Sequence, residues 1–236
     1  MKAIILAGGI GTRLKKIIKD VPKPMALIGE KPFLEYLILQ LKKWSIKEIV
    51  LSVGYKNEKI IDYFGNGDKW GVKIIYCREE LPLGTGGALR ESSRIIKDKN
   101  FIVMNGDSFL VIDLNKLISY HKHKKAIATI ATVHVDNTNR YGRIEINENG
   151  EIIKFIEKGY SGKGFINSGI YIINRELINN IPEGAISLEN GILPMLINHG
   201  LYGIKIKKFF MDIGIPEDYL KLKKKPDKLI SKIQGI

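Results

Sequence analysis

The feature that most constrains this chain is a short apolar run followed at once by a glycine-rich loop. Residues 3–7 are all apolar, and Gly8, Gly9 and Gly11 come directly after them. Such a run predicts a strand buried on both faces, as in a parallel sheet. Glycines let the backbone approach a bulky anion and point N–H groups toward it. Because ligands of open parallel sheets bind beyond the carboxyl ends of the strands, the loop predicts a phosphate site there.

The first 135 residues alternate between strand and helix patterns. Apolar residues recur at helical spacing over residues 33–44, 85–96 and 114–123. Further strand-like runs occupy residues 48–53, 73–76, 101–104 and 127–133. This alternation predicts parallel strands with helices on both faces of the sheet.

The pattern changes after Val135. Residues 142–146 and 151–156 alternate by twos around Asn149-Gly150, which is a strong hairpin signal. More strands are expected at residues 165–173 and 201–207, with a helix between them at residues 188–197. We predict one α/β domain, a Rossmann-like three-layer sandwich with a mostly parallel central sheet and a small β-rich subregion. Its expected parts are residues 1–135, residues 136–212 and a C-terminal helix over residues 213–236.

Composition argues against several classes of protein. The 236 residues carry a net charge of +13, but no basic stripe is interleaved with aromatics, so solvated lysines are favoured over nucleic-acid binding. No run approaches the roughly 18 apolar residues of a membrane span. The single Cys77 excludes an internal disulfide and favours a cytoplasmic location. His121 and His123 are expected at the surface, and a homo-oligomer is left open.

The glycine loop fits neither of two common nucleotide motifs. A dinucleotide fingerprint needs a glycine where Leu14 stands and an acid after the second strand, where Ser52 and Val53 stand. A Walker loop needs Gly-Lys-Ser/Thr, which is absent. Shortly afterwards, Lys23 lies between Pro22 and Pro24. The prolines stiffen this segment, so that it is able to hold a cation in a site.

Taken together, these motifs resemble the signature of the sugar-1-phosphate nucleotidyltransferase family. Residues 8–14 read Gly-Gly-x-Gly-Thr-Arg-Leu, residues 22–25 read Pro-Lys-Pro-Met, and the family pattern continues along nearly the whole chain. The resemblance implies an enzyme that joins a sugar 1-phosphate to a nucleoside triphosphate and releases pyrophosphate. It implies nucleotide contacts at Leu6, Ala7, Gly8, Gly9, Gly11, Thr12, Arg13, Glu79, Gly84 and Thr85. It implies sugar-phosphate contacts at Gly142, Glu157, Lys158, Asn167 and Gly169.

The resemblance also implies a metal site. Asp107 and Asp212 match the two metal-binding acids of the family, and Arg13 and Lys23 complete its catalytic set. Two carboxylates with phosphate oxygens form a hard oxygen site suited to Mg²⁺. The nucleophile is the phosphate oxygen of the sugar 1-phosphate, which is already ionised at neutral pH. No Ser, Cys or His nucleophile is therefore required.

The base and the sugar are less constrained. Glu79 stands five positions before Gly84, where family members commonly contact the base. A carboxylate can accept from both N1–H and N2–H₂ of guanine, which favours GTP; the alternative is a solvated loop acid. Within the family, the pattern resembles D-glycero-α-D-manno-heptose 1-phosphate guanylyltransferases, which make GDP-heptose for bacterial surface glycans. Mannose-1-phosphate guanylyltransferase, another hexose-1-phosphate nucleotidyltransferase or a non-catalytic regulatory subunit remain alternatives.

Overall fold

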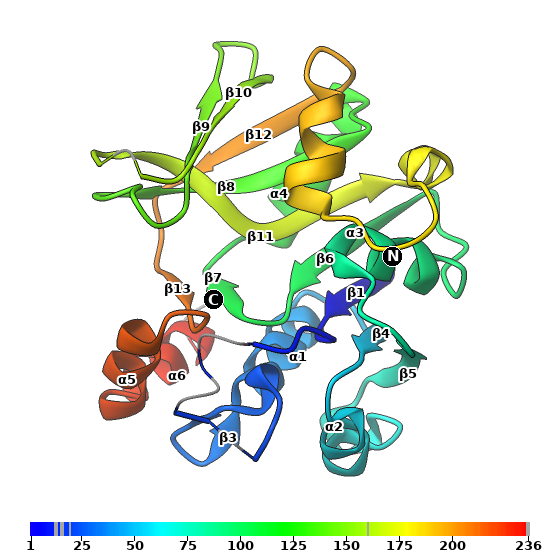
Figure 1. Cartoon of the computed structure of the whole chain (residues 1–236), viewed down its shortest axis with the longest axis vertical. Helices are drawn as coiled ribbons and strands as arrows, with labels where there is room; N and C mark the ends of the chain where they lie inside the picture. The colour runs from blue at the N-terminus through cyan, green and yellow to red at the C-terminus, as the bar shows by residue number, and fades with distance from the viewer. Residues whose placement is uncertain (12–13, 15–16, 19, 160, 235–236) are drawn as a thin grey trace.

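A single sheet organises the molecule (Figure 1). The computed structural model describes residues 1–11, 14, 17–18, 20–159 and 161–234. Within these residues, the amino-terminal half of the sheet is parallel and has the order β6-β1-β4-β5. The strands are β1 (Ala3–Leu6), β4 (Glu48–Val53), β5 (Lys73–Arg78) and β6 (Asn100–Asn105). The predicted first strand therefore has parallel neighbours on both sides, which explains its continuous apolar run.

The carboxyl-terminal half of the sheet adds mainly antiparallel strands. The long β11 (Gly164–Asn174) pairs antiparallel with β6 and with β8 (Ala128–Val135). The β9–β10 hairpin (Arg143–Ile146 and Ile152–Ile156) continues this end, and β12 (Leu201–Ile206) runs parallel to β8. The strand expected at residues 127–133 is thus present but lies outside the parallel set, because β11 separates it from β6.

Two hydrophobic cores cover the two faces of the sheet, so the predicted three-layer α/β fold is confirmed. On β1, Ala3 and Ile5 belong to one core and Ile4 to the other, as alternation along a strand requires. The first core includes α1 (Phe33–Lys43), α2 (Asn57–Phe64) and the start of α4 (Leu114–Lys124). The second includes α3 (Gly84–Ser93) and the segment of short turns after β11.

Short elements connect the layers. A 3₁₀ turn, η1 (Lys23–Met25), follows the glycine loop and precedes the small β2–β3 pair (Leu27–Ile28 and Lys31–Pro32). Another 3₁₀ turn, η2 (Asp68–Trp70), precedes β5, and η3 (Arg175–Asn180) follows β11. The helix expected at residues 188–197 is a π-helical turn, η4 (Leu188–Ile192), followed by a 3₁₀ turn, η5 (Leu193–Leu196). Pro194 has no backbone N–H to donate, which prevents one continuous α-helix here.

The chain then returns to the first half of the sheet. β13 (Phe210–Asp212) pairs antiparallel with β7 (Ser108–Leu110), and α5 (Pro216–Lys224) and α6 (Asp227–Gln234) follow. In Figure 1 these two helices lie at the lower left of the molecule. Where one C-terminal helix was expected, Pro226 separates two, because proline disfavours a helical residue before it. No described helix is both long and apolar enough to cross a membrane.

His121 was wrongly expected at the surface. Its side chain is buried on α4, with 2% of its area exposed. Nδ1 lies 2.9 Å from the hydroxyl of Thr129, and Nε2 lies 3.2 Å from Oδ1 of Asn100. Burial lowers the pKa of His121 to about 4, so the ring is neutral at pH 7. His123, two residues later on the helix, is exposed as predicted.

Candidate active site

The first cavity lies at the carboxyl ends of the parallel strands. It has a volume of about 400 Å³. Backbone of the glycine loop and of the start of α3 forms much of its wall, and Lys23, Glu79 and Asp107 also line it. The residues predicted to contact the nucleotide that reach this cavity are Leu6, Ala7, Gly8, Gly9, Gly11, Glu79, Gly84 and Thr85. Thr12 and Arg13 lie outside the described residues.

Glu79 packs directly against the glycine loop. A Cβ added at Gly8 would lie 2.2 Å from Oε1 of Glu79, so a side chain there would displace the carboxylate. Ser52 Oγ donates to Oε1 at 2.9 Å, and the backbone N–H of Leu83 donates to Oε2 at 3.4 Å. These contacts orient the carboxylate in the wall of the cavity. Glu79 is therefore not simply a solvated loop acid.

Three charged side chains converge where the two halves of the molecule meet. Lys23 Nζ donates to Oδ2 of Asp107, and the backbone N–H of Ile213 donates to the Asp107 carbonyl at 2.9 Å. The β7–β13 pair brings Asp212 opposite Ser108. A Cβ added at Gly214 would lie 2.8 Å from Asp212 Oδ1, 3.1 Å from Lys23 Nζ and 3.6 Å from Asp107 Oδ2. Acids 105 positions apart in the sequence are thus neighbours in space.

The two acids repel each other electrostatically. Burial and, after it, the negative charge of Asp107 raise the pKa of Asp212, which lies at about 6. The backbone N–H of Gly214 and the ammonium of Lys23 act in the opposite sense. Burial and mutual repulsion disfavour the charged forms of the two carboxylates. A hard divalent cation bound between them would stabilise both charged forms, so the site fits such an ion.

The second cavity adjoins this cluster on the side of the β-rich subregion and has a volume of about 360 Å³. It contains all five residues predicted to contact the sugar phosphate: Gly142, Glu157, Lys158, Asn167 and Gly169. Asp107 and Asp212 line it as well, and Asp107 also lines the first cavity. Gly142 and Gly169 have φ values of +74° and +78°, which favour glycine. The glycines permit these turns to approach Ile156 O and the Asn105 side chain.

Sequence reasoning missed two charged residues of the second cavity. Arg140 lines the cavity and forms ion pairs with Glu217 and Asp218 of α5. Glu189, in η4, accepts hydrogen bonds from several side chains in the cavity wall. Arg140 stands two positions before Gly142, a predicted contact, and this proximity could have indicated it. No local motif marks Glu189, which reaches the site through the packing of distant segments.

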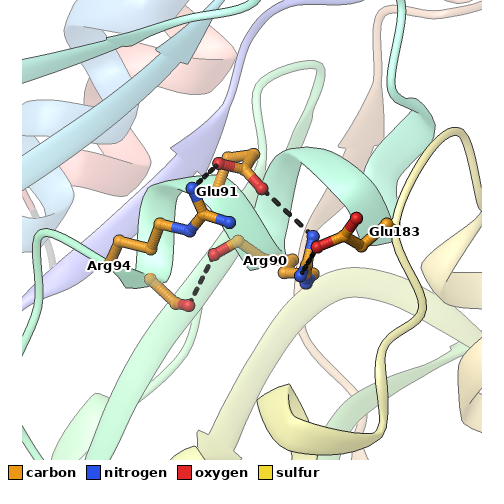
Figure 2. Close-up of polar contacts among 5 residues, drawn as sticks. Arg90, Glu91, Arg94 and Glu183 are labelled. Carbon is orange, nitrogen blue, oxygen red and sulfur yellow. Dashed lines mark hydrogen bonds and ion pairs between the residues drawn. The ribbon is translucent and has the colours of Figure 1, made fainter.

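The segment that carries Glu189 is attached to α3. Figure 2 shows Arg90 between Glu91 and Glu183; the latter ion pair measures 2.7 Å. At the other end of the helix, the N–H of Gly86 donates to the Ile186 carbonyl at 2.8 Å. Thr85 lines the first cavity and Ser187 and Glu189 line the second, so the start of α3 and residues 186–189 lie between the two cavities, while the Arg90–Glu183 pair lies outside both linings.

The fold and the site define a class of protein: an α/β chain with two adjoining cavities that meet at an acidic, lysine-paired cluster. The chain belongs to the nucleotidyl transferase family, which matches residues 2–228.

Several relatives resemble most of the chain. It is 42% identical to the D-glycero-alpha-D-manno-heptose 1-phosphate guanylyltransferase of Campylobacter jejuni, covering 93% of this chain and 97% of the relative. Identity to the enzyme of that name from Aneurinibacillus thermoaerophilus is 40%, with coverage of 95% and 97%. Mannose-1-phosphate guanylyltransferase of Mycobacterium tuberculosis is 32% identical, and the match covers 93% of this chain but 62% of that protein.

A solved structure resembles the fold closely. The crystal structure of HddC from Yersinia pseudotuberculosis, complexed with GMP-PN, superposes with a TM-score of 0.85. It is 39% identical to this chain, and the match covers 95% of this chain and 98% of HddC.

Proposed function

We propose that this protein transfers GMP from GTP to D-glycero-α-D-manno-heptose 1-phosphate, giving GDP-heptose and pyrophosphate. The observation that carries the proposal is the pair of cavities that meet at Lys23, Asp107 and Asp212. A phosphate oxygen of the sugar 1-phosphate forms a bond to the α-phosphorus of GTP. The bond from that phosphorus to the bridging oxygen breaks, and the electron pair leaves with pyrophosphate.

In this proposal the first cavity holds GTP. The glycine loop would place backbone N–H groups around the phosphates, with Arg13 at the outer phosphates. Lys23 would neutralise charge at the reacting phosphates, where the transition state carries the most negative charge. Each oxygen of Glu79 already accepts one protein donor, which leaves acceptor capacity for the two donors of guanine.

Asp107 and Asp212 would hold Mg²⁺. The mutual repulsion of the two acids supports this role. When bound, the ion would supply charge stabilisation at the phosphate oxygens. Lys23, which here pairs with Asp107, would then be available to contact a phosphate.

The second cavity would hold the sugar 1-phosphate. Lys158 offers a cation for its phosphate, while Glu157, Asn167 and the backbone at Gly142 and Gly169 offer partners for hydroxyls. In this division, residues 1–135 contribute the nucleotide side and residues 136–212 the sugar side of a single domain. Synthesis of GDP-heptose for surface glycans would place the reaction in the cytoplasm.

Similarity supports the choice of substrates. The two heptose 1-phosphate guanylyltransferases match over nearly their whole length, and the HddC complex contains GMP-PN. Mannose 1-phosphate is the second candidate, because mannose-1-phosphate guanylyltransferases also match, at lower identity. Heptose differs from mannose by one carbon with its hydroxyl, so the cavity must extend beyond C6.

A direct competition tests the proposal. Purified protein is supplied with GTP, Mg²⁺ and equal concentrations of heptose and mannose 1-phosphates, and the two GDP-sugars are quantified. GDP-heptose should predominate; excess GDP-mannose would favour the second candidate. Parallel reactions with UTP, dTTP and CTP test the base. No pyrophosphate release with any pair would favour a non-catalytic regulatory subunit that binds nucleotide sugars.

A further inference from the structure

Glu189 lies in the wall between the two cavities, where its carboxylate accepts four hydrogen bonds. Thr85 Oγ1 donates to Oε2 at 2.5 Å, and Ser187 Oγ donates to the same oxygen at 3.2 Å. Asn105 Nδ2 and the hydroxyl of Tyr171 donate to Oε1 at 3.2 and 3.3 Å. A carboxylate has about four lone-pair sites, so these protein donors use its whole capacity. Glu189 is therefore suited to holding protein groups rather than substrate.

The four donors belong to different parts of the site. Thr85 lines the first cavity, and Asn105 lines both cavities. Tyr171 is fully buried, and its hydroxyl accepts from Asn167 Nδ2 at 2.9 Å while it donates to Glu189. Through Tyr171 the carboxylate also reaches Asn167, one of the predicted sugar-phosphate contacts. One carboxylate is thus bonded to groups of both cavities.

The two cavities depend on this carboxylate to different degrees. On the nucleotide side, Thr85 also accepts from the N–H of Leu188 at 2.8 Å, and Gly86 N–H donates to Ile186 O. Neither bond involves the side chain of Glu189. On the sugar side, the single hydroxyl hydrogen of Tyr171 goes to Glu189. Asn105 lines both cavities; its Oδ1 is buried and lacks a hydrogen-bond partner among the described residues, so the Nδ2–Glu189 bond orients this amide.

We propose that Glu189 is a positioning residue that, through Tyr171, fixes Asn167 in the sugar-phosphate cavity relative to the nucleotide loop. The proposal rests on the proposed function of the two cavities. It concerns orientation alone, since protein donors occupy the carboxylate of Glu189.

The test measures the two substrates separately. For the purified full chain, the Kd of GTP with Mg²⁺ is determined by calorimetry without sugar phosphate, when no transfer occurs. kcat and KM for the heptose 1-phosphate are then determined at saturating GTP. Glu189→Ala should leave the Kd of GTP within about threefold, but should lower kcat/KM for the sugar phosphate about tenfold or more, as expected for loss of charge-assisted bonds.

Three further variants sharpen the result. Glu189→Gln should recover part of the loss, because its amide oxygen can still accept from Asn105 and Tyr171. Tyr171→Phe keeps the ring and removes the hydroxyl, so it should lower the same parameter about threefold or more. Glu183→Gln is the matched control: Glu183 lies on the same segment but its side chain is 84% exposed and pairs with Arg90 (Figure 2). It should behave as wild type.

Defined results would overturn the proposal. Sugar-phosphate kinetics within twofold of wild type in Glu189→Ala would do so, as would a loss of GTP affinity equal to the loss for the sugar phosphate. If Glu189→Ala does not fold, unchanged sugar-phosphate kinetics in Tyr171→Phe would overturn the proposal. A wild-type protein without transfer activity contradicts the proposed function instead. The role of Glu189 is then tested by calorimetry with the sugar 1-phosphate alone. Equal affinity in wild type and in Tyr171→Phe would overturn the positioning role of Glu189, and so would the absence of binding by both proteins.

Discussion

The walls of the two cavities differ in how much backbone and how many side chains they contain. The first includes much backbone in its wall, because five glycines line it, at the glycine loop after β1, at the start of α3 and after β6. The second is lined mainly by side chains that come from β9–β11, η4, β13 and the loops between them. A backbone wall needs only the local conformation of a short segment. A side-chain wall needs several segments to be fixed relative to one another, which is the role inferred for Glu189.

This difference separates three kinds of residue. Lys158 lies in the second cavity and Glu79 in the first, whereas Asp107 lines both. A change at the shared residue should impair both substrates, while changes in one cavity should leave the other substrate unaffected. The following predictions test that separation.

The largest effect is expected at the shared cluster. Asp107→Asn should lower kcat/KM for both substrates on the order of 100-fold, because a weakened metal ligand affects the step that both substrates share. Pyrophosphate release is the measurement, and EDTA should abolish it in wild type. Asp62→Asn, at an exposed acid on α2, is the control. Undiminished turnover in EDTA would rule out the proposed metal site.

A smaller and one-sided effect is expected for Lys158→Ala. Loss of a charge-assisted bond to the sugar phosphate costs about 2 kcal/mol, a factor of roughly 30 in kcat/KM for that substrate. Affinity for GTP, measured by calorimetry, should not change. Lys163→Ala removes an exposed lysine that follows β10 in the same connection and serves as the control. Lost GTP affinity with normal sugar-phosphate kinetics would reverse the assignment.

The opposite one-sided effect is expected for Glu79→Gln. An amide cannot accept from both guanine donors with one oxygen while keeping its contacts to Ser52 and Leu83. The preference for GTP over UTP, as a ratio of kcat/KM values, should fall about tenfold. Metal dependence and KM for the sugar phosphate should remain. Glu80→Gln, at the exposed neighbour, is the control; an unaltered ratio in Glu79→Gln would exclude base recognition by this residue.

The smallest effect concerns stability and should involve neither cavity. Because the pKa of His121 falls from 6.5 in the unfolded chain to about 4 in the fold, its contribution to stability is present above pH 6.5. It is lost as the pH falls from 6.5 toward 4, by about 1 kcal/mol at pH 5.5. The raised pKa of Asp212 gives an opposite trend between its unfolded value and about 6.

Comparison of variants isolates the contribution of His121 to the pH dependence of stability. Urea denaturation of wild type and His121→Gln at pH 7.5 and 5.5 should show a smaller loss of stability on acidification in the variant. His123→Gln, at the exposed histidine of the same helix, should follow wild type. Equal pH dependence in all three proteins would contradict a buried neutral His121.

The sequence by itself determined the class of fold, the first cavity and the family resemblance. Buried parallel strands and phosphate loops are encoded in contiguous residues, such as the run at residues 3–7 and the glycines after it, so local patterns reveal them. It also named residues of the second cavity, but only through the resemblance.

Only the tertiary structure shows which segments and which polar side chains contact one another. It paired β13 with β7 and so brought Asp212 to Asp107, placed β11 between β6 and β8, and buried His121 against Thr129. It also gathered Thr85, Asn105 and Tyr171 around Glu189. Periodicity shows which face of a helix is apolar, but not which polar partner another strand will supply. Such contacts depend on strand order and on side-chain packing between different elements, for which a local pattern carries no signal.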